Sequence, residues 1–263
     1  MDHNISPAQI PDHLIGQGRY WATTAELAKL TGSSLPGLYS SLASLEHANK
    51  LFTPAKGLYV AVPPDYRSWG AVPADWFIDP MMRHLGRYYY VAFLSAAARH
   101  GASHQAPQAF QVIVDRPLRD RDIGRIHLRF TTSEDAEHMA VHRATTHTGY
   151  VTVATPEATV VDLAWKPRAG AGLNNVATVL SGLGTLDGDS LARLAEYRGR
   201  CVARRIGWLL THFRPDVDTH WLKLVARPDE GKATLLQPGG PPSRGHRDKA
   251  WNVRVNATVE PDL

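Results

Sequence analysis

The sequence predicts an α+β protein in two parts: an N-terminal winged helix-turn-helix in residues 1–66, followed by a larger mixed α+β domain in residues 67–263. Two short amphipathic helical patterns joined by a glycine-containing turn, with a hairpin pattern after them, predict the first part. Prolines and glycines in residues 63–73 interrupt all periodicity and mark the boundary. Beyond it, strand and helix patterns mix without regular alternation, which favours an α+β arrangement.

The helix-turn-helix prediction depends on the placement of leucines. Residues 24–30 form a short helical pattern closed by Thr31-Gly32. Leu38, Leu42 and Leu45 then recur at spacings of four and three, which places them on one face of a second helix. That helix therefore buries its leucines and turns its polar residues to solvent.

Small polar side chains on this second helix suit a major groove, because they bond to bases or phosphates without holding the helix away. Two apolar runs, residues 51–53 and 58–62, flank a turn-rich connection and predict a β-hairpin, or wing, with Lys56 at its tip. The candidate DNA-contacting residues are Ser33, Ser34, Tyr39, Ser40, Ser41, Ser44, Lys50 and Lys56.

Charge supports a competing interpretation of this unit. The chain carries a net charge of +4, yet residues 1–62 hold four Lys/Arg and four Asp/Glu, so the basic excess lies toward the C-terminus. A small helical interaction module is therefore the alternative to a DNA-binding module.

In the larger part, Asp79-Pro80 indicates a helix start with Asp79 as the cap, and an apolar, alanine-rich stretch runs from Tyr88 to His100. We expect one helix over this segment, with a break near Gly86 left open. Thr155 is expected to cap a helix that begins at Pro156. Strands are expected at residues 111–114, 126–130, 150–153, 233–236 and 251–255, and further helices at 173–183, 190–197 and 202–213.

Composition bounds the class of protein. With 43% hydrophobic and 21% charged residues, the chain of 263 residues is an ordinary globular protein and neither disordered nor collagen-like. Its single cysteine, Cys201, excludes an internal disulfide and a thiolate-rich zinc site. The sequence shows no signal-peptide pattern and no apolar run near the ~20 residues that span a bilayer. We therefore expect a cytoplasmic protein with no membrane partner.

Several segments together resemble the AbiEi-like abortive-infection antitoxins, a family of winged-helix transcriptional regulators. The N-terminal pattern of residues 24–28 and the hairpin pattern of 56–60 are similar to that family's winged helix. Three later segments resemble the larger domain of that family. They are Tyr88–Gly101, residues 155–163 with their Pro-Glu helix start and Asp-Leu, and the tryptophan strand of 251–256. The likeness extends in order over nearly the whole chain.

The resemblance implies a repressor that is also the antitoxin of a toxin-antitoxin system. The winged helix would bind inverted repeats of double-stranded operator DNA in the chain's own promoter. The larger domain would neutralise a nucleotidyltransferase-like toxin, with no catalytic residues, cofactor or metal. Ala158 stands where many members have arginine, so any role of that arginine is not carried over.

A metal-dependent nuclease or hydrolase with an N-terminal DNA-targeting module is the alternative function. His138 and His142 are four residues apart, a spacing that would place two imidazoles on one helical face, but a solvated turn is the favoured interpretation. Asp115 and Asp162 lack the nearby lysine of a nuclease motif, and we expect Asp162 to be a buried or capping residue paired with a cation.

Four arginines in the stretch of residues 190–213 form the last candidate. If that stretch is helical, Arg200 and Arg204 project together. A solvated helix face and a patch for nucleic acid or an acidic partner are both open. The candidate phosphate or partner patch consists of Arg198, Arg200, Arg204 and Arg205.

Overall fold

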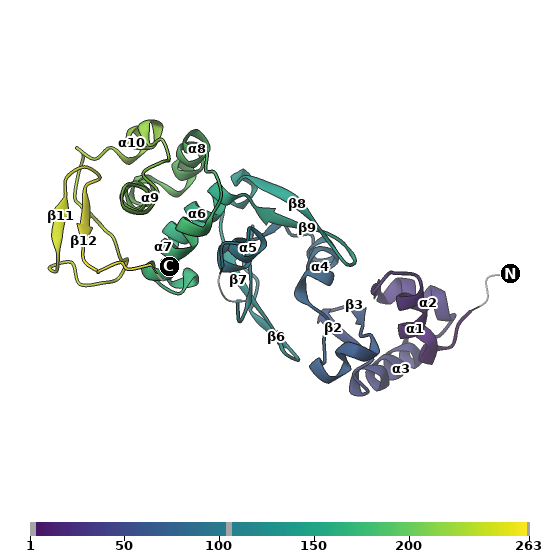
Figure 1. Ribbon diagram of the computed structural model, residues 1–263. Helices are drawn as coiled ribbons and strands as arrows, with labels where there is room; N and C mark the ends of the chain where they lie inside the picture. Colours follow the sequence, from purple (N-terminus) through teal and green to yellow (C-terminus); the bar gives the residue numbers. More distant parts are fainter. Residues whose placement is uncertain (1–3, 104–106, 262–263) are drawn as a thin grey trace.

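The computed structural model describes residues 4–103 and 107–261. Figure 1 shows an elongated arrangement, with the N-terminal helices at one end, a sheet in the middle, and helices with a small second sheet at the other end. Helices and strands mix in the larger part without regular alternation, so the predicted α+β class is confirmed.

The N-terminal unit has the predicted winged helix-turn-helix order. Its helices α2 and α3 are followed by the antiparallel hairpin of β2 and β3, and β1 adds to β3 on the other side. Sequence patterns missed η1, α1 and β1. The elements are η1 (Pro7–Gln9), α1 (Ile10–Gly16), β1 (Trp21–Thr23), α2 (Thr24–Thr31), α3 (Leu35–His47), β2 (Leu51–Ala55) and β3 (Leu58–Ala61).

Local chemistry explains where α2 begins and ends. The Thr23 side chain accepts a hydrogen bond from the backbone N–H of Glu26, and the Glu26 carboxylate accepts from the Thr23 N–H in return. This capping box satisfies two donors that the first helical turn leaves unpaired. Gly32 ends the helix with φ 63°, in the left-handed region that glycine adopts without steric cost.

The predicted leucine face of α3 is confirmed. Leu38, Leu42 and Leu45 are buried and pack with Leu27 of α2 in a small core. The other side of this core comes from α1 and the hairpin, through Ile10, Leu14, Leu51, Tyr59 and Ala61.

The hairpin contributes to two cores, because alternate side chains along a strand point to opposite faces. Phe52, Leu58 and Val60 face away from α3 and belong to the core of the larger part. The ring of Phe52 lies 5.1 Å from that of Phe77, edge to face. The predicted boundary region contains two short 3-10 helices, η2 (Pro64–Trp69) and η3 (Ala74–Trp76).

The middle of the chain forms a mixed sheet of strand order β6-β7-β5-β4-β9-β8. The β4/β9 and β5/β7 pairs are parallel and the other pairs are antiparallel. Its strands are β4 (Tyr89–Val91), β5 (Phe110–Val114), β6 (Arg121–Ile123), β7 (Ile126–Thr132), β8 (Val141–Thr146) and β9 (Gly149–Ala154). The predicted strands at 111–114, 126–130 and 150–153 are β5, β7 and β9, whereas β6 and β8 were not predicted.

The prediction of a continuous helix from Tyr88 to His100 is wrong. Tyr89–Val91 is a central strand that pairs with β5 on one side and β9 on the other. Aromatic and β-branched side chains fit such a doubly buried strand, and this packing overrides the helical preference of the alanines that follow. The helix α5 (Phe93–Arg99) starts only after Ala92.

The prediction that Asp79 caps a helix starting at Pro80 is also wrong. The helix α4 (Ile78–Leu85) begins one residue before Asp79, after Phe77. The Asp79 carboxylate instead accepts a hydrogen bond from the Tyr89 hydroxyl at 3.0 Å and pairs with Arg83 at 2.6 Å.

Helices cover the far end of the molecule beyond the sheet (Figure 1). Thr155 caps α6 as predicted, because its side chain accepts from the Ala158 N–H. The elements are η4 (Ala136–His138), α6 (Pro156–Trp165), η5 (Pro167–Gly170), α7 (Leu173–Gly182), α8 (Gly188–Arg198), α9 (Arg200–Phe213) and α10 (His220–Ala226), and the small sheet of β10 (Thr234–Leu235), β11 (His246–Asp248) and β12 (Val253–Val255).

Candidate nucleic-acid interface and buried ion pair

Helix α3 carries four of the eight candidate DNA-contacting residues, namely Tyr39, Ser40, Ser41 and Ser44. Leu35 and Tyr39 are half exposed, at 52% and 50%. Ser34, Ser40 and Ser44 are exposed, whereas Ser33 and Ser41 are half-buried. Leu35 shares the spacing of the buried leucines, yet it is the first residue of the helix and lies beyond the core.

Two serines of α3 already use their hydroxyl protons in hydrogen bonds to the helix backbone. Ser41 donates to the carbonyl oxygen of Gly37 at 3.0 Å, and Ser44 donates to that of Ser40 at 3.1 Å. Each hydroxyl oxygen keeps its acceptor capacity, which matches the amino groups on base edges. Ser34 is the residue before α3, but its side chain makes no capping hydrogen bond.

One lysine lies in the hairpin turn and another lies just before the hairpin. Lys56 is exposed in its turn and Lys50 is half-buried just before β2, and neither forms an ion pair with any residue the structure describes. The turn itself is anchored, because the His84 imidazole of α4 lies 2.9 Å from the Lys56 carbonyl oxygen. Arg19, in contrast, is paired with Glu26 and lies over the Trp21 ring at 4.3 Å.

The prediction of a surface patch of four arginines is wrong, because three of the four side chains are buried. Arg198, Arg204 and Arg205 are buried, and only Arg200 is exposed, near Glu230 at 3.5 Å. Arg204 donates to main-chain carbonyl oxygens of Ala226, Arg227, Glu230 and Lys232. Arg205 donates to those of Ala164, Leu235 and Leu236. Buried guanidinium groups require such acceptors, and the groups then hold loops together and do not reach a partner.

Arg198 has a different role. Its Nη2 lies 2.9 Å from Asp162 Oδ1, and the Asp162 carboxylate is fully buried. The Tyr90 hydroxyl donates to Asp162 Oδ2 at 3.0 Å. Burial raises the pKa of Asp162 to about 6, and the nearby Arg198 charge limits that rise. The expected pairing of Asp162 with a cation is confirmed.

Comparison with known protein families identifies the part of the chain that contains this ion pair. Residues 90–212 match the family model described as the AbiEi antitoxin C-terminal domain. The chain contains an AbiEi antitoxin C-terminal domain. This matched AbiEi domain runs from β4 to α9, so the Asp162–Arg198 pair lies inside it.

The fold as a whole also has a solved counterpart. The crystal structure of the RV2827C protein from Mycobacterium tuberculosis superimposes with a TM-score of 0.65. It is 15% identical in sequence, and the match covers 96% of this chain and 92% of that one. At this identity the likeness is one of fold, and it includes the N-terminal winged helix. No curated protein matches the sequence significantly.

The histidines of the AbiEi domain do not share a helical face. His138 ends the short helix η4, whereas His142 lies on strand β8. His138 stacks on Tyr197 at 4.8 Å, and His142 lies 5.6 Å from His100. Within residues 4–103 and 107–261, no group of three or more His, Cys, Asp or Glu side chains is placed to hold a metal ion. In the same part of the chain, no helix is long and apolar enough to cross a bilayer.

Proposed function

We propose that this chain is the antitoxin of a toxin-antitoxin system, that it represses its own operon, and that it acts without catalysis. The match of residues 90–212 to the AbiEi antitoxin C-terminal domain carries the proposal. In it, the partner is a nucleotidyltransferase-like toxin, and the DNA target is an inverted repeat in the promoter.

The N-terminal unit supports the repressor role. Helix α3 presents a face of short hydroxyl side chains with the half-exposed Tyr39, while its leucines are buried. A helix whose outer face is small and polar can approach base edges in a major groove. Lys56 on the hairpin turn and Lys50 beside it supply the positive charge that phosphate contact requires.

The repressor role is tested with the full chain and a fluorescent duplex of its own promoter. We expect a shifted complex on the promoter and a much weaker one on a duplex of the same length with scrambled repeats. Equal affinity for both duplexes at moderate salt would show non-specific binding and contradict the operator assignment.

The antitoxin role is tested by co-expression with the protein encoded beside this chain. We expect growth arrest by that protein alone and restored growth when this chain is present. If the full chain is expressed and folded but growth is not restored, the antitoxin assignment fails. Incubation of the purified chain with DNA and Mg²⁺ tests the nuclease alternative, and cleavage would replace the proposal of a protein without catalysis.

A further inference from the structure

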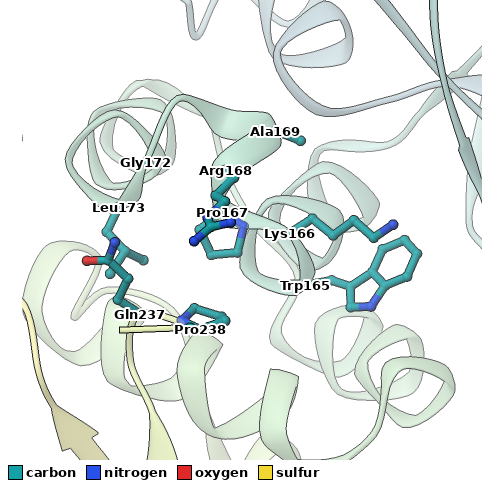
Figure 2. A pocket seen from close by; sticks show the side chains of 10 residues that line it. Trp165, Lys166, Pro167, Arg168, Ala169, Gly172, Leu173, Gln237 and Pro238 are labelled. Atoms are coloured by element: carbon teal, nitrogen blue, oxygen red, sulfur yellow. The ribbon is translucent and has the colours of Figure 1, made fainter. Parts of the chain in front are cut away.

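A cavity of about 420 Å³ lies in the larger part of the molecule, between the end of α6 and the segment that follows β10. One wall consists of residues 165–169, where α6 ends and η5 begins, together with Gly172 and Leu173. The other wall is the segment 237–239, which follows β10 (Figure 2). Its size falls within the range of about 300–1,000 Å³ typical of small-molecule sites.

Both walls are held in place by hydrogen bonds from buried or half-buried side chains. Gln111 of β5 donates to the Ala169 carbonyl oxygen at 2.7 Å. Asn256 accepts from the Gln237 N–H at 2.9 Å. Arg205 joins the two walls, because it donates to Ala164 at the end of α6 and, at 2.8 Å, to Leu236. The cavity is therefore preformed, which lowers the ordering cost of binding a ligand.

The charged side chains that line the cavity are both cations. Lys166 and Arg168 are exposed, and neither makes an ion pair or a side-chain hydrogen bond with another residue of the described chain. No carboxylate lines the cavity. Figure 2 shows the two side chains extending from the same loop in different directions, with Arg168 beside Pro167.

The Trp165 ring, part of the first wall, lies against two cations. The Trp165 ring has the Lys166 ammonium 4.3 Å from its centre and the Arg198 guanidinium at 4.1 Å. Asp162 is buried and already paired with Arg198. Partial burial of its ammonium group, and then the nearby charge of Arg198, lowers the pKa of Lys166. Among the described residues, neither Lys166 nor Arg168 has an ion-pair partner, and an anion would supply one.

The remaining wall is apolar. Pro167, Leu173 and Pro238 present rigid or branched side chains that suit contact with a flat or aliphatic group. We propose that the cavity binds an organic anion, with a carboxylate or phosphate group at Arg168 and an apolar body against this wall. A planar guanidinium binds both kinds of anion through two parallel hydrogen bonds.

Titration calorimetry of the full chain tests the proposal with three probes: phenylacetate, phenyl phosphate and the neutral phenylacetamide. We expect at least one anion to bind and the amide not to bind. Tighter binding of phenyl phosphate would assign phosphate esters as the ligand class, and tighter binding of phenylacetate would assign carboxylic acids.

Arg168→Glu should weaken binding of the anion by at least about tenfold, because a charge-assisted pair becomes a repulsive one. Arg119→Glu is the matched control, since Arg119 is exposed and lies outside the cavity lining, and it should bind as the wild type does. Thermal melting of both variants checks that they are folded. Equal binding of the amide, unchanged binding by the Arg168 variant, or no binding of either anion would each overturn the proposal.

Discussion

Asp162 and Arg198 come from α6 and the end of α8, 36 residues apart in sequence, and form a 2.9 Å ion pair in the core of the AbiEi domain. Only 2% of the arginine side chain and none of the carboxylate is exposed. The Tyr90 hydroxyl, from the central strand β4, bonds to both partners. Sheet and helices are thus connected through one buried polar cluster, and a cluster of this kind is costly to leave half satisfied.

Removal of the cation should therefore destabilise the protein strongly. Arg198→Leu leaves the Asp162 carboxylate buried without its partner, which typically costs about 3 to 5 kcal/mol of unfolding free energy. Urea denaturation at pH 8 measures the loss. The loss should be smaller at pH 5, because Asp162 then takes up a proton. A loss under about 1 kcal/mol at pH 8 would contradict this account.

The same carboxyl group predicts a pH dependence of stability. Its pKa is about 6 in the folded protein and near the ordinary value of 3.8 when unfolded. The folded state thus binds the proton more tightly, so the stabilisation by protonation is fully present below about pH 4 and is lost as pH rises through 6. Urea titrations of wild type and Asp162→Asn between pH 4 and 8 isolate this contribution. A difference between the two that is constant with pH would show that the carboxyl pKa is not raised.

The face of α3 gives a prediction about DNA. Ser40→Glu with Ser44→Glu should abolish promoter binding, because two carboxylates would repel phosphates, and should leave stability almost unchanged since both residues are exposed. Fluorescence anisotropy measures the affinity. Ser68→Glu with Ser243→Glu adds the same charge at exposed sites outside α3 and should bind as the wild type does. Retained affinity of the α3 variant at moderate salt would remove this face from the proposed interface.

The buried side of α3 should respond in the opposite way. Leu42 is 1% exposed, and Leu42→Ala should cost about 2 to 5 kcal/mol, the usual range for emptying a core position. Leu35→Ala, on the exposed first turn, should change stability by no more than about 0.5 kcal/mol. Urea denaturation compares the two variants. Equal effects would mean that the face assignment of the helix is wrong.

Local sequence patterns correctly predicted those helices whose position depends only on residues close by in the sequence. The spacing of Leu38, Leu42 and Leu45 is a property of one helix, and Thr155 caps the helix that follows it directly. Tyr89–Val91 could not be recognised as a strand, because its pairing partners lie about 20 and 60 residues later in the chain. Long-range packing decided that segment.

The arginine patch and the cavity show the same limit at the level of function. Arg205 was expected at the surface, yet the carbonyl oxygens that bury it come from α6 and from the segment around β10. The cavity likewise joins residues 165–169 with 237–239, so neither wall shows a motif in the sequence. The hydroxyl face of α3 was predictable because a single helix carries it.

The predicted division at residue 66 leads to the last test. Phe52 and Val60 of the hairpin pack into the core of the larger part, so a fragment of residues 1–66 loses the cover of Phe77 on that face. We expect this fragment to keep its helical core and to bind the promoter more weakly than the full chain. We also expect it to bind a hydrophobic dye and to associate, because an exposed apolar face of this kind drives association.

Sedimentation and dye fluorescence of the 1–66 fragment, compared with the full chain, provide the measurement. The variant Phe52→Lys in the fragment is the matched control: it replaces the exposed ring by a charge and should reduce both association and dye binding. In the full chain the same substitution should be strongly destabilising, because there the ring is buried against Phe77. A wild-type fragment that stays monomeric and binds no dye would show that the hairpin does not need the larger part, and residue 66 would then be a true domain boundary.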